Sequence, residues 1–436
     1  MTGSRHRRRR LNQTVALAAA VPLALAAAAC GTSATSSTGG GTKTTATTTN
    51  SAGKTVTTTN LVLTAQDYYT DEPGHTLWAK TLAECGTTNG VTVKQQSIPG
   101  VQLIAKVLQE ASSHTMPDLL MLDNPDMQQI ATTGALTPLS DYGVDTTGFY
   151  PTILSAGTYQ GKVYGLAPNV NSIALIYNKK LVAKAGITTP PTTWAELSAD
   201  AKKTTSRGVY GLAMSAIASY EGTWQFLPFF WTAGADLKNL NSPQAAQALT
   251  YWKSLVDNGS MSKSSLNWTQ GNVDDQFIAG KAAFMINGPW NFPNLNAAKG
   301  LEYGIASIPV PKAGDKVVAP LGGEVWTVPV TSPDRQKAAA KVIACLNSPA
   351  NQLTYGTANF TVPSRIAVSQ QYAKQVPSMA SFVTEVSTAR ARTAELGTKW
   401  PVTATAIYNA IQSVLTGKAS VAQALATAQK SSTNGS

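Results

Sequence analysis

The sequence predicts an α/β protein of two lobes, each built on a central, mostly parallel sheet flanked by helices. Strand-like and helix-like segments alternate from Leu61 onward, an order typical of parallel sheets covered by helices. The run from Leu119 to Leu122 is apolar throughout, as in a strand buried on both faces. About 375 residues follow the N-terminal segments, more than the roughly 250–300 that one core supports, so two lobes are expected.

Residues 1–29 are interpreted as an export signal. Arginines dominate positions 5 to 10, and an uncharged run rich in Ala and Leu extends from Val15 to Ala29, directly before Cys30. This run is shorter than the roughly 20 residues of a membrane span, which favours a cleaved signal. Five of the 34 basic residues lie in residues 1–29, so 29 basic and 23 acidic residues remain after cleavage of the signal. No Lys/Arg cluster is left that would predict nucleic-acid binding.

Residues 30–59 are expected to be a tether, because they are almost entirely Thr, Ser, Gly and Ala, with little apolar surface to offset ordering. Predicted elements then follow in order. Strands are expected at 61–64, 91–95 and 118–122, with helices at 76–85 and 101–112 between them. This is a βαβαβ unit.

Residues typical of helix ends predict further helices along the chain. Thr193 and Glu196 form a capping box, and a serine followed by proline marks a helix start at each of Ser242, Ser332 and Ser348. A core stripe of Leu249, Trp252 and Val256 precedes Gly259, and a last helix is predicted over 420–430.

Two cysteines remain beyond Cys30, each on the apolar stripe of a predicted helix. Cys85 shares its stripe with Trp78 and Leu82, and Cys345 shares its own with Ala338 and Val342. Two interpretations stay open: small buried apolar residues, or a disulfide formed after export. The remaining histidines, His75 and His114, have no Cys/His spacing, so neither a metal site nor a cofactor is expected.

Polar and aromatic residues follow two apolar strands. Asp123 and Asn124 end the strand at 118–122, and Trp290 follows the predicted strand at 282–286. Ligands of open α/β sheets bind outside the carboxyl ends of strands. Carboxylates and amides exchange hydrogen bonds with hydroxyls, and an indole face covers an apolar sugar face. The alternatives are a helix N-cap for Asp123 and a packed core ring for Trp290.

Four stretches resemble a known family in their order along the chain. They are residues 117–139, which begin PDLLMLDN; residues 159–197, which include YQGKVYG, ALIYNK and WAEL; residues 277–290, FIAGKAAFMINGPW; and residues 320–329, PLGGEVWTVP, followed by Ser348-Pro349. The chain resembles the extracellular solute-binding proteins of carbohydrate ABC importers, the family of maltose-binding protein. The resemblance covers nearly all of residues 61–430.

The resemblance implies a two-lobed clamp of the periplasmic-binding-protein type, which closes on a sugar. Three chain crossings are expected, near Val170–Ser172, Gly322–Val325 and Thr357–Val362. The N-terminal lobe would comprise 60–171 and 324–358, and the C-terminal lobe 172–323 and 359–431. The ligand-binding positions implied are Asp123, Asn124, Asn171, Trp224, Trp290, Gly323, Glu324 and Trp326.

The resemblance also implies a lipid anchor on Cys30 and a place on the outer face of the cytoplasmic membrane. Position 27 is alanine, where lipoproteins of the family usually have leucine, and the arginines also fit a twin-arginine signal loosely. The expected partners are a carbohydrate and the permease subunits of an importer. A monomer is expected, without nucleic acid or cofactor.

Three other functions compete with sugar capture. A secreted glycoside hydrolase needs two carboxyls flanking the scissile bond, and the adjacent Asp274 and Asp275 read instead as a solvated surface pair. The same fold could bind a peptide, a polyamine or a polyol phosphate, although a phosphate calls for clustered arginines or backbone nests. An adhesion protein would not need two lobes. A binding protein without catalytic activity is therefore expected.

Overall fold

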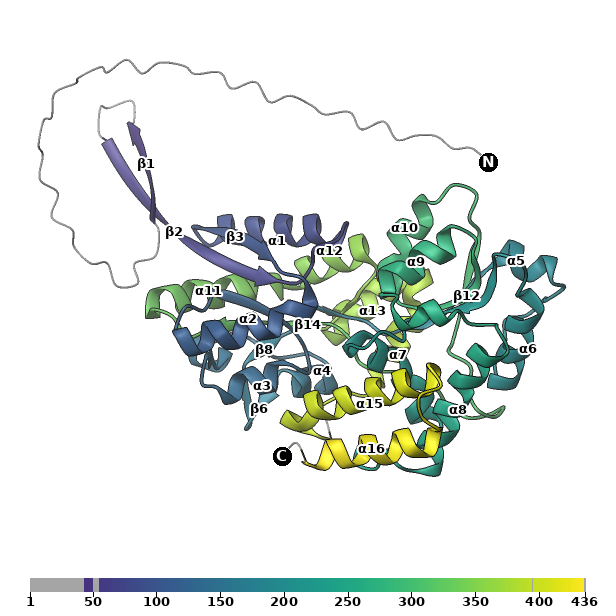
Figure 1. Ribbon diagram of the computed structural model, residues 1–436. Helices are drawn as coiled ribbons and strands as arrows, with labels where there is room; N and C mark the ends of the chain where they lie inside the picture. Colours follow the sequence, from purple (N-terminus) through teal and green to yellow (C-terminus); the bar gives the residue numbers. More distant parts are fainter. Residues whose placement is uncertain (1–42, 50–54, 394, 435–436) are drawn as a thin grey trace, which may run out of the picture. The chain divides into compact units, whose positions relative to one another are not determined.

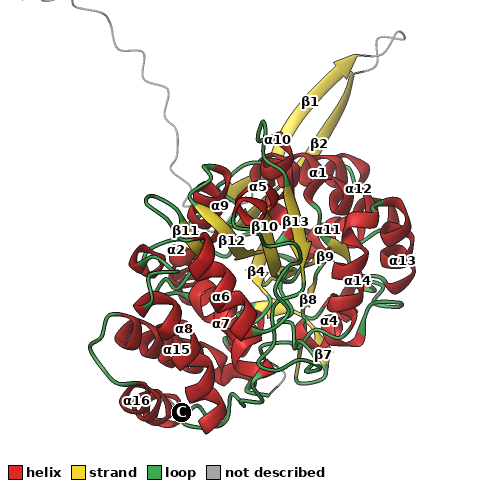
Figure 2. Cartoon of the chain, turned by 90° about the vertical axis from the view of Figure 1, so that its right-hand side faces the viewer, coloured by secondary structure: helices red, strands yellow, loops and turns green. Residues whose placement is uncertain are grey.

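The computed structural model describes residues 43–49, 55–393 and 395–434 (Figure 1). The predicted export signal and Cys30 lie outside these residues. Within them the chain forms two separate sheets of three or more strands, and Figure 2 shows their strands flanked by helices. This architecture confirms the predicted α/β class with two lobes.

The first sheet has seven strands in the order β1-β2-β4-β14-β5, with β3 added beside β2 and β8 beside β14. The strands are β1 (Lys43–Thr49), β2 (Thr55–Asp67), β3 (Val91–Ser97), β4 (Leu119–Asp123), β5 (Leu136–Thr137), β8 (Gly165–Leu166) and β14 (Glu324–Pro329). β2 pairs in parallel with β3 and β4, with α1 (Gly74–Thr88) and α2 (Gly100–Ser113) as connections. The predicted βαβαβ unit is therefore present.

The second sheet has four strands in the order β11-β12-β10-β13. They are β10 (Ala174–Asn178), β11 (Tyr210–Ala213), β12 (Ala282–Asn287) and β13 (Tyr303–Ala306). β11 and β12 are parallel, whereas β10 runs antiparallel to β12 and β13. In the first sheet β14 is likewise antiparallel to β4, β5 and β8. The prediction of mostly parallel sheets is thus wrong, because both sheets are mixed. In the first sheet, β14 is entered from the second sheet rather than through a helical crossover, which a parallel neighbour would need.

Along the sequence, the chain passes from the first sheet to the second and later returns to the first. It leaves the first sheet after β8 and enters the second at β10, passing through β9 (Asn169–Val170). It returns between β13 and β14. β9 pairs antiparallel with β15 (Val362–Pro363), which follows α12 (Pro349–Asn359). Two of the segments predicted as crossings, Val170–Ser172 and Gly322–Val325, lie at these two connections. The third, Thr357–Val362, runs from the end of α12 to β15, which pairs with β9.

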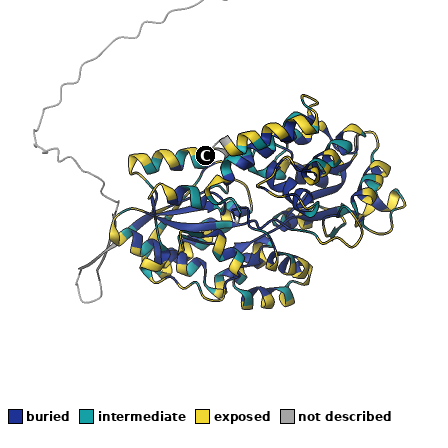
Figure 3. Cartoon of the chain, turned by 90° about the horizontal axis from the view of Figure 1, so that it is seen from below, coloured by how far each residue is buried: buried dark blue, intermediate teal, exposed yellow. Residues whose placement is uncertain are grey.

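Helices cover the sheets and supply most of the apolar side chains. The remaining ones are α3 (Met127–Thr132), α4 (Pro151–Ala156), α5 (Lys179–Lys184), α6 (Trp194–Thr204), α7 (Tyr220–Thr232), α8 (Pro243–Asp257), α9 (Gln270–Ile278), α10 (Phe292–Ala297), α11 (Pro333–Leu346), α13 (Ile366–Gln375), α14 (Ala380–Ser387), α15 (Trp400–Leu415) and α16 (Val421–Asn434). Figure 3 shows buried strands inside and exposed outer helix faces. In the described part of the chain, no helix is both long and apolar enough to traverse a bilayer.

Helix caps and the cysteine pair follow from particular residues. Thr193 and Glu196 form the predicted capping box, and Ser242 and Ser348 cap their helices through their side chains, whereas Ser332 does not. Cys85 of α1 and Cys345 of α11 form a disulfide, with their Cα atoms 5.7 Å apart. Of the two interpretations left open above, the structure has the bonded one.

The predicted tether is partly a hairpin. Residues 43–49 form β1, which pairs antiparallel with residues 55–61 at the start of β2. The expectation of an unstructured tether is therefore wrong for the described residues of this segment. Threonine is β-branched and favours strands, and the pairing extends a strand that residues 61–67 already form.

Candidate ligand-binding site

The site is built around the carboxyl end of β4. Asp123 is the last residue of β4 and lies opposite Glu324, the first residue of β14, in the sheet register. The Asp123 carboxylate accepts two hydrogen bonds from Arg392, at 2.7 Å from Nη1 and 2.5 Å from Nη2. Arg392 is only 3% exposed, so this is a buried, two-pronged ion pair. It ties the end of β4 to the segment between α14 and α15.

Glu324 is held by two tyrosines that directly follow β2. The Tyr68 hydroxyl donates to Glu324 Oε1 at 2.6 Å, and Tyr69 is hydrogen-bonded to the same carboxyl group. The two tyrosine rings are stacked, with centroids 5.3 Å apart. Burial, reinforced by the nearby Asp123 charge, raises the pKa of Glu324 to about 7, although the tyrosine hydrogen bonds act in the opposite direction. Glu324 is therefore partly protonated near neutral pH.

A third carboxyl group lies beside these two. Asp126 precedes α3, is 4% exposed, and is hydrogen-bonded by Tyr220 at the start of α7. Burial raises the pKa of Asp126 well above its usual value, and the charge of Asp123 adds to this effect, while Arg392 opposes it. We call Asp123, Asp126, Glu324 and Arg392 the charged cluster.

Two indoles adjoin the charged cluster. Trp224 of α7 and Trp290, in the short turn after β12, have ring centroids 5.8 Å apart with planes inclined by 31°. The Arg392 guanidinium lies 5.9 Å from the Trp224 ring centre and 6.0 Å from that of Trp400. Trp224 is buried and Trp290 is half-buried. The pair therefore places apolar ring surface next to carboxylates, a combination suited to a sugar ring with hydroxyls.

The glycine pair of the second crossing lies against the same residues. Gly322 exchanges backbone hydrogen bonds with Asn171, and a Cβ added to Gly322 would lie 2.0 Å from Asn171 Oδ1. Gly323 has a φ of +111°, in the region that favours glycine. The Asn124 side-chain amide donates to the Gly323 carbonyl at 3.0 Å. Close backbone approach explains the glycines, and Asn124 holds this crossing in place.

Seven of the eight positions expected from the resemblance are thus brought together: Asp123, Asn124, Asn171, Trp224, Trp290, Gly323 and Glu324. Trp326 is not among them. It is fully buried and packs edge-on against Trp78, with ring centroids 5.4 Å apart. It lies two residues, roughly 6.6 Å, further along β14 than Glu324, which places it inside the core rather than at the strand end. A side chain buried in this way is not exposed for contact with a ligand, contrary to the expectation for Trp326.

Five residues of the site were not predicted: Tyr68, Tyr69, Asp126, Tyr220 and Arg392. The two tyrosines directly follow β2, so the rule that placed Asp123 at a strand end could have found them. Asp126 lies three residues after Asp123, and Tyr220 begins the aromatic run of α7. Arg392 has no such signal, because it comes from a loop far along the chain that follows no strand.

Asp274 also differs from its prediction. It was expected on the surface beside Asp275, but it is 3% exposed on α9, whereas Asp275 is exposed. It precedes Phe277 by three residues, so both lie on the buried face of the helix. Burial raises the pKa of Asp274 to about 7. The pair is therefore not a solvated surface pair.

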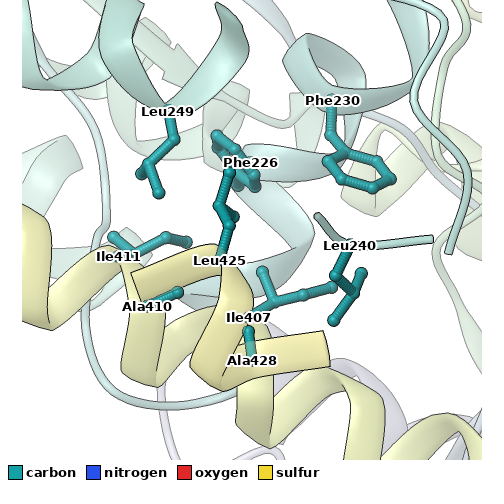
Figure 4. Close-up of a pocket in the computed structure, with 9 residues that line it drawn as sticks. All are labelled: Phe226, Phe230, Leu240, Leu249, Ile407, Ala410, Ile411, Leu425 and Ala428. Carbon is teal, nitrogen blue, oxygen red and sulfur yellow. The ribbon is translucent and has the colours of Figure 1, made fainter. Parts of the chain in front are cut away.

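A cavity in the second lobe offers no alternative site. It measures about 10 Å³ and lies between α7, α8, α15 and α16 (Figure 4). Its lining is entirely apolar: Phe226, Phe230, Leu240, Leu249, Ile407, Ala410, Ile411, Leu425 and Ala428. This is space for about one water molecule, so it is a packing void. Among the described residues, no group of three His, Cys, Asp or Glu could hold a metal ion.

Comparisons with known proteins identify the family of the chain. Residues 80–381 match the family described as bacterial extracellular solute-binding protein. The chain is 27% identical over 254 residues to the maltooligosaccharide ABC transporter solute-binding lipoprotein of Streptococcus pneumoniae, a match over 55% of this chain and 58% of that protein. The chain spans somewhat more than half the length of the first curated relatives it matches.

Two solved structures are similar over nearly their full length. The cyclic alpha-maltosyl-1,6-maltose binding protein of Arthrobacter globiformis is 26% identical, with a TM-score of 0.71 over 86% of this chain and 98% of that one. The maltose-bound MalE3 of T. maritima is 22% identical, with a TM-score of 0.78 over 86% of this chain and 99% of that one. The second likeness supports the two-lobed fold.

Proposed function

Because the chain belongs to the bacterial extracellular solute-binding protein family, we propose that it captures a carbohydrate by lobe closure and delivers it to an ATP-driven importer. The observation that carries the proposal is the juxtaposition of Trp224 and Trp290 with the charged cluster. Indole faces cover the apolar face of a sugar ring, while carboxylates and amides take its hydroxyls. Relatives that bind maltooligosaccharides support the same ligand class.

The energetics are adequate for this function. Each hydroxyl contact contributes about 0.5–1.5 kcal/mol net, or about 1.5–3 kcal/mol with a charged partner such as Asp123. A micromolar dissociation constant corresponds to about −8 kcal/mol. One or two stacked rings and several hydroxyl contacts therefore suffice.

Closure would couple capture to transport. Asp123 and Glu324 lie in the first sheet, whereas Trp224 and Trp290 lie on elements beside the second. A ligand that contacts both sets stabilises the closed arrangement, which the permease can then select. The glycine pair at the second crossing suits a hinge.

The same proposal covers export and partners. Cleavage before Cys30 and lipidation of that cysteine would hold the protein at the outer face of the cytoplasmic membrane, beside the permease. The protein would act as a monomer and would not alter its ligand. Replacing Cys30 with alanine should release it from the membrane fraction into the medium, and retention of the variant in membranes would contradict the anchor.

A thermal-shift screen tests the ligand class. The chain without residues 1–29 is screened against mono- and oligosaccharides, a peptide library, polyamines and polyol phosphates. A ligand at 100 times its dissociation constant stabilises by about 2.7 kcal/mol, a readily measured shift. A shift with a sugar that is recovered unchanged supports the proposal. A sugar that is consumed would indicate a hydrolase, and a response confined to peptides, polyamines or phosphates would replace the carbohydrate.

A further inference from the structure

The charged cluster holds more carboxyl groups than cations. Asp123 lies opposite Glu324 in the sheet register, and its backbone carbonyl accepts a hydrogen bond from the Asp126 N–H at 2.9 Å. The charge of Asp123 raises the pKa of both neighbours, and that of Arg392 lowers it. Arg392, however, already uses both terminal nitrogens on Asp123. Among the described residues, Asp126 and Glu324 therefore lie near only one cation, Arg392, and its terminal nitrogens are hydrogen-bonded to Asp123.

The shortage of hydrogen-bond donors and cations is most evident at Asp126. Its side chain is almost completely buried, and within the described part of the chain its Oδ1 atom has no hydrogen-bond partner. A buried carboxylate without a full set of partners is costly, and the cost is relieved by protonation or by a cation. A ligand with a protonated amine would reduce this cost, because its N–H group can donate a hydrogen bond to Asp126 and its positive charge attracts the carboxylate.

The adjoining indoles favour the same kind of ligand group. A cation within about 6 Å of an indole ring is attracted by the negative face of that ring. The Arg392 guanidinium already lies at 5.9 Å from the Trp224 ring centre. Trp290, next to Trp224, is only half-buried, so part of its side chain remains exposed for contact with a cation or with the apolar face of a sugar ring.

We propose that this site prefers a sugar bearing a protonated amine, an amino sugar, over the neutral sugar of the same configuration. The inference rests on the proposed function and narrows its ligand class. The ammonium group is held by Asp126 and Glu324, the hydroxyls by Asp123 and Arg392, and the sugar ring packs on Trp290. Because Glu324 retains a proton in the free protein below about pH 7, binding of the cation also releases protons.

Titration calorimetry at pH 6.5 on the chain without residues 1–29 tests this with matched pairs. The pairs are glucose with glucosamine, galactose with galactosamine, mannose with mannosamine, and cellotetraose with the glucosamine tetramer of the same linkage. Maltotriose and spermidine complete the set. At least one amino sugar is expected to bind ten or more times more tightly than its neutral partner. Its binding enthalpy should differ between buffers of different ionisation enthalpy, which reports proton release.

Two variants assign the preference to its residues. Asp126→Asn and Glu324→Gln each remove a charge while keeping the shape, and each should reduce the affinity ratio between amino and neutral sugar to below about threefold. If one of these variants fails to fold, the other still tests the inference. Asp275→Asn removes an exposed charge on α9 and should leave both affinities unchanged.

The remaining outcomes each overturn the inference. If neutral sugars bind and no amino sugar binds more tightly, the preference is wrong and sugar capture stands. If spermidine binds and no sugar does, sugar capture fails as well. If nothing in the set binds, the preference for amino sugars is wrong, because at least one amino sugar of the set is expected to bind. If the preference persists in both variants, these carboxyl groups are not its source.

Discussion

Trp290 is the residue whose loss should affect ligand affinity most directly. Its half-buried ring lies over Gly288, where an added Cβ would be only 1.8 Å from it, so the backbone fixes the indole in place. Trp290→Ala is expected to weaken sugar binding about tenfold to a hundredfold, because ring burial and stacking each contribute on the order of 1–2 kcal/mol. Calorimetry with the sugar found in the screen measures the loss.

A matched control separates this effect from a general one. Tyr210 is an exposed aromatic residue on β11, in the same lobe as Trp290. Tyr210→Ala should leave the affinity unchanged, and both variants should retain the far-ultraviolet circular dichroism of the parent. Unchanged affinity in Trp290→Ala would remove this residue from the site.

Trp326 should behave in the opposite way. Its ring is completely buried against Trp78. Trp326→Ala therefore leaves a core cavity and should lower the free energy of unfolding by about 3–5 kcal/mol. Urea unfolding measures this, and Trp326→Phe, which keeps most of the volume, should retain both the fold and the sugar affinity. A large loss of affinity in the stable Phe variant would return Trp326 to the binding site.

Sequence patterns could place these residues on strands but could not decide which tryptophan meets a ligand. Trp290 follows a strand end, where ligands of α/β proteins bind, and it was predicted on that basis. Trp326 is only two residues from Glu324, and no local signal distinguishes the position at the start of β14 from the fully buried position two residues later. Arg392 could not be predicted for a different reason, because its contact with Asp123 spans 269 residues of sequence.

At the scale of elements, the disulfide fastens α1 to α11 across most of the chain. It joins residues 260 apart, so it removes many conformations from the unfolded chain. Replacing both Cys85 and Cys345 with alanine should lower the free energy of unfolding by roughly 2–5 kcal/mol. Urea unfolding with and without a thiol reductant checks this. The reductant should destabilise the parent and leave the double variant unchanged, and an unaffected parent would show that the bridge contributes nothing.

The predictability of the elements follows the range of the interactions that form them. β2, β3 and β4 with their two helices were found because apolar runs and helix caps are local signals. The antiparallel direction of β14 was not, since it depends on the chain returning from the second sheet. The pairing of β1 with β2 was missed because threonine-rich composition was weighed for apolar content alone, although threonine favours strands.

For the whole molecule, buried carboxyl groups set how stability depends on pH. Burial raises the pKa of Glu324 and Asp274 to about 7 and that of Glu385 to about 8. Each folded-state pKa lies above the unfolded value near 4, so the folded protein holds these protons more tightly. The stabilisation is complete below about pH 4 and is lost as the pH rises through 7 to 8. Carboxyls with lowered pKa, such as Asp145 and Glu196, are already ionised above pH 6 and do not contribute in that window.

The protein should therefore unfold at a lower temperature at pH 8 than at pH 6. The free energy of unfolding is expected to fall by on the order of a few kcal/mol over this interval, which corresponds to a decrease in Tm of about 5 °C or more. Thermal unfolding followed by circular dichroism at constant ionic strength measures it. A variant combining Glu324→Gln, Asp274→Asn and Glu385→Gln should be clearly less pH-dependent than the parent, while Asp126, whose pKa burial also raises, still contributes. A Tm that rises from pH 6 to pH 8, or a variant as pH-dependent as the parent, would show that other groups govern stability, because these three amides can no longer release a proton.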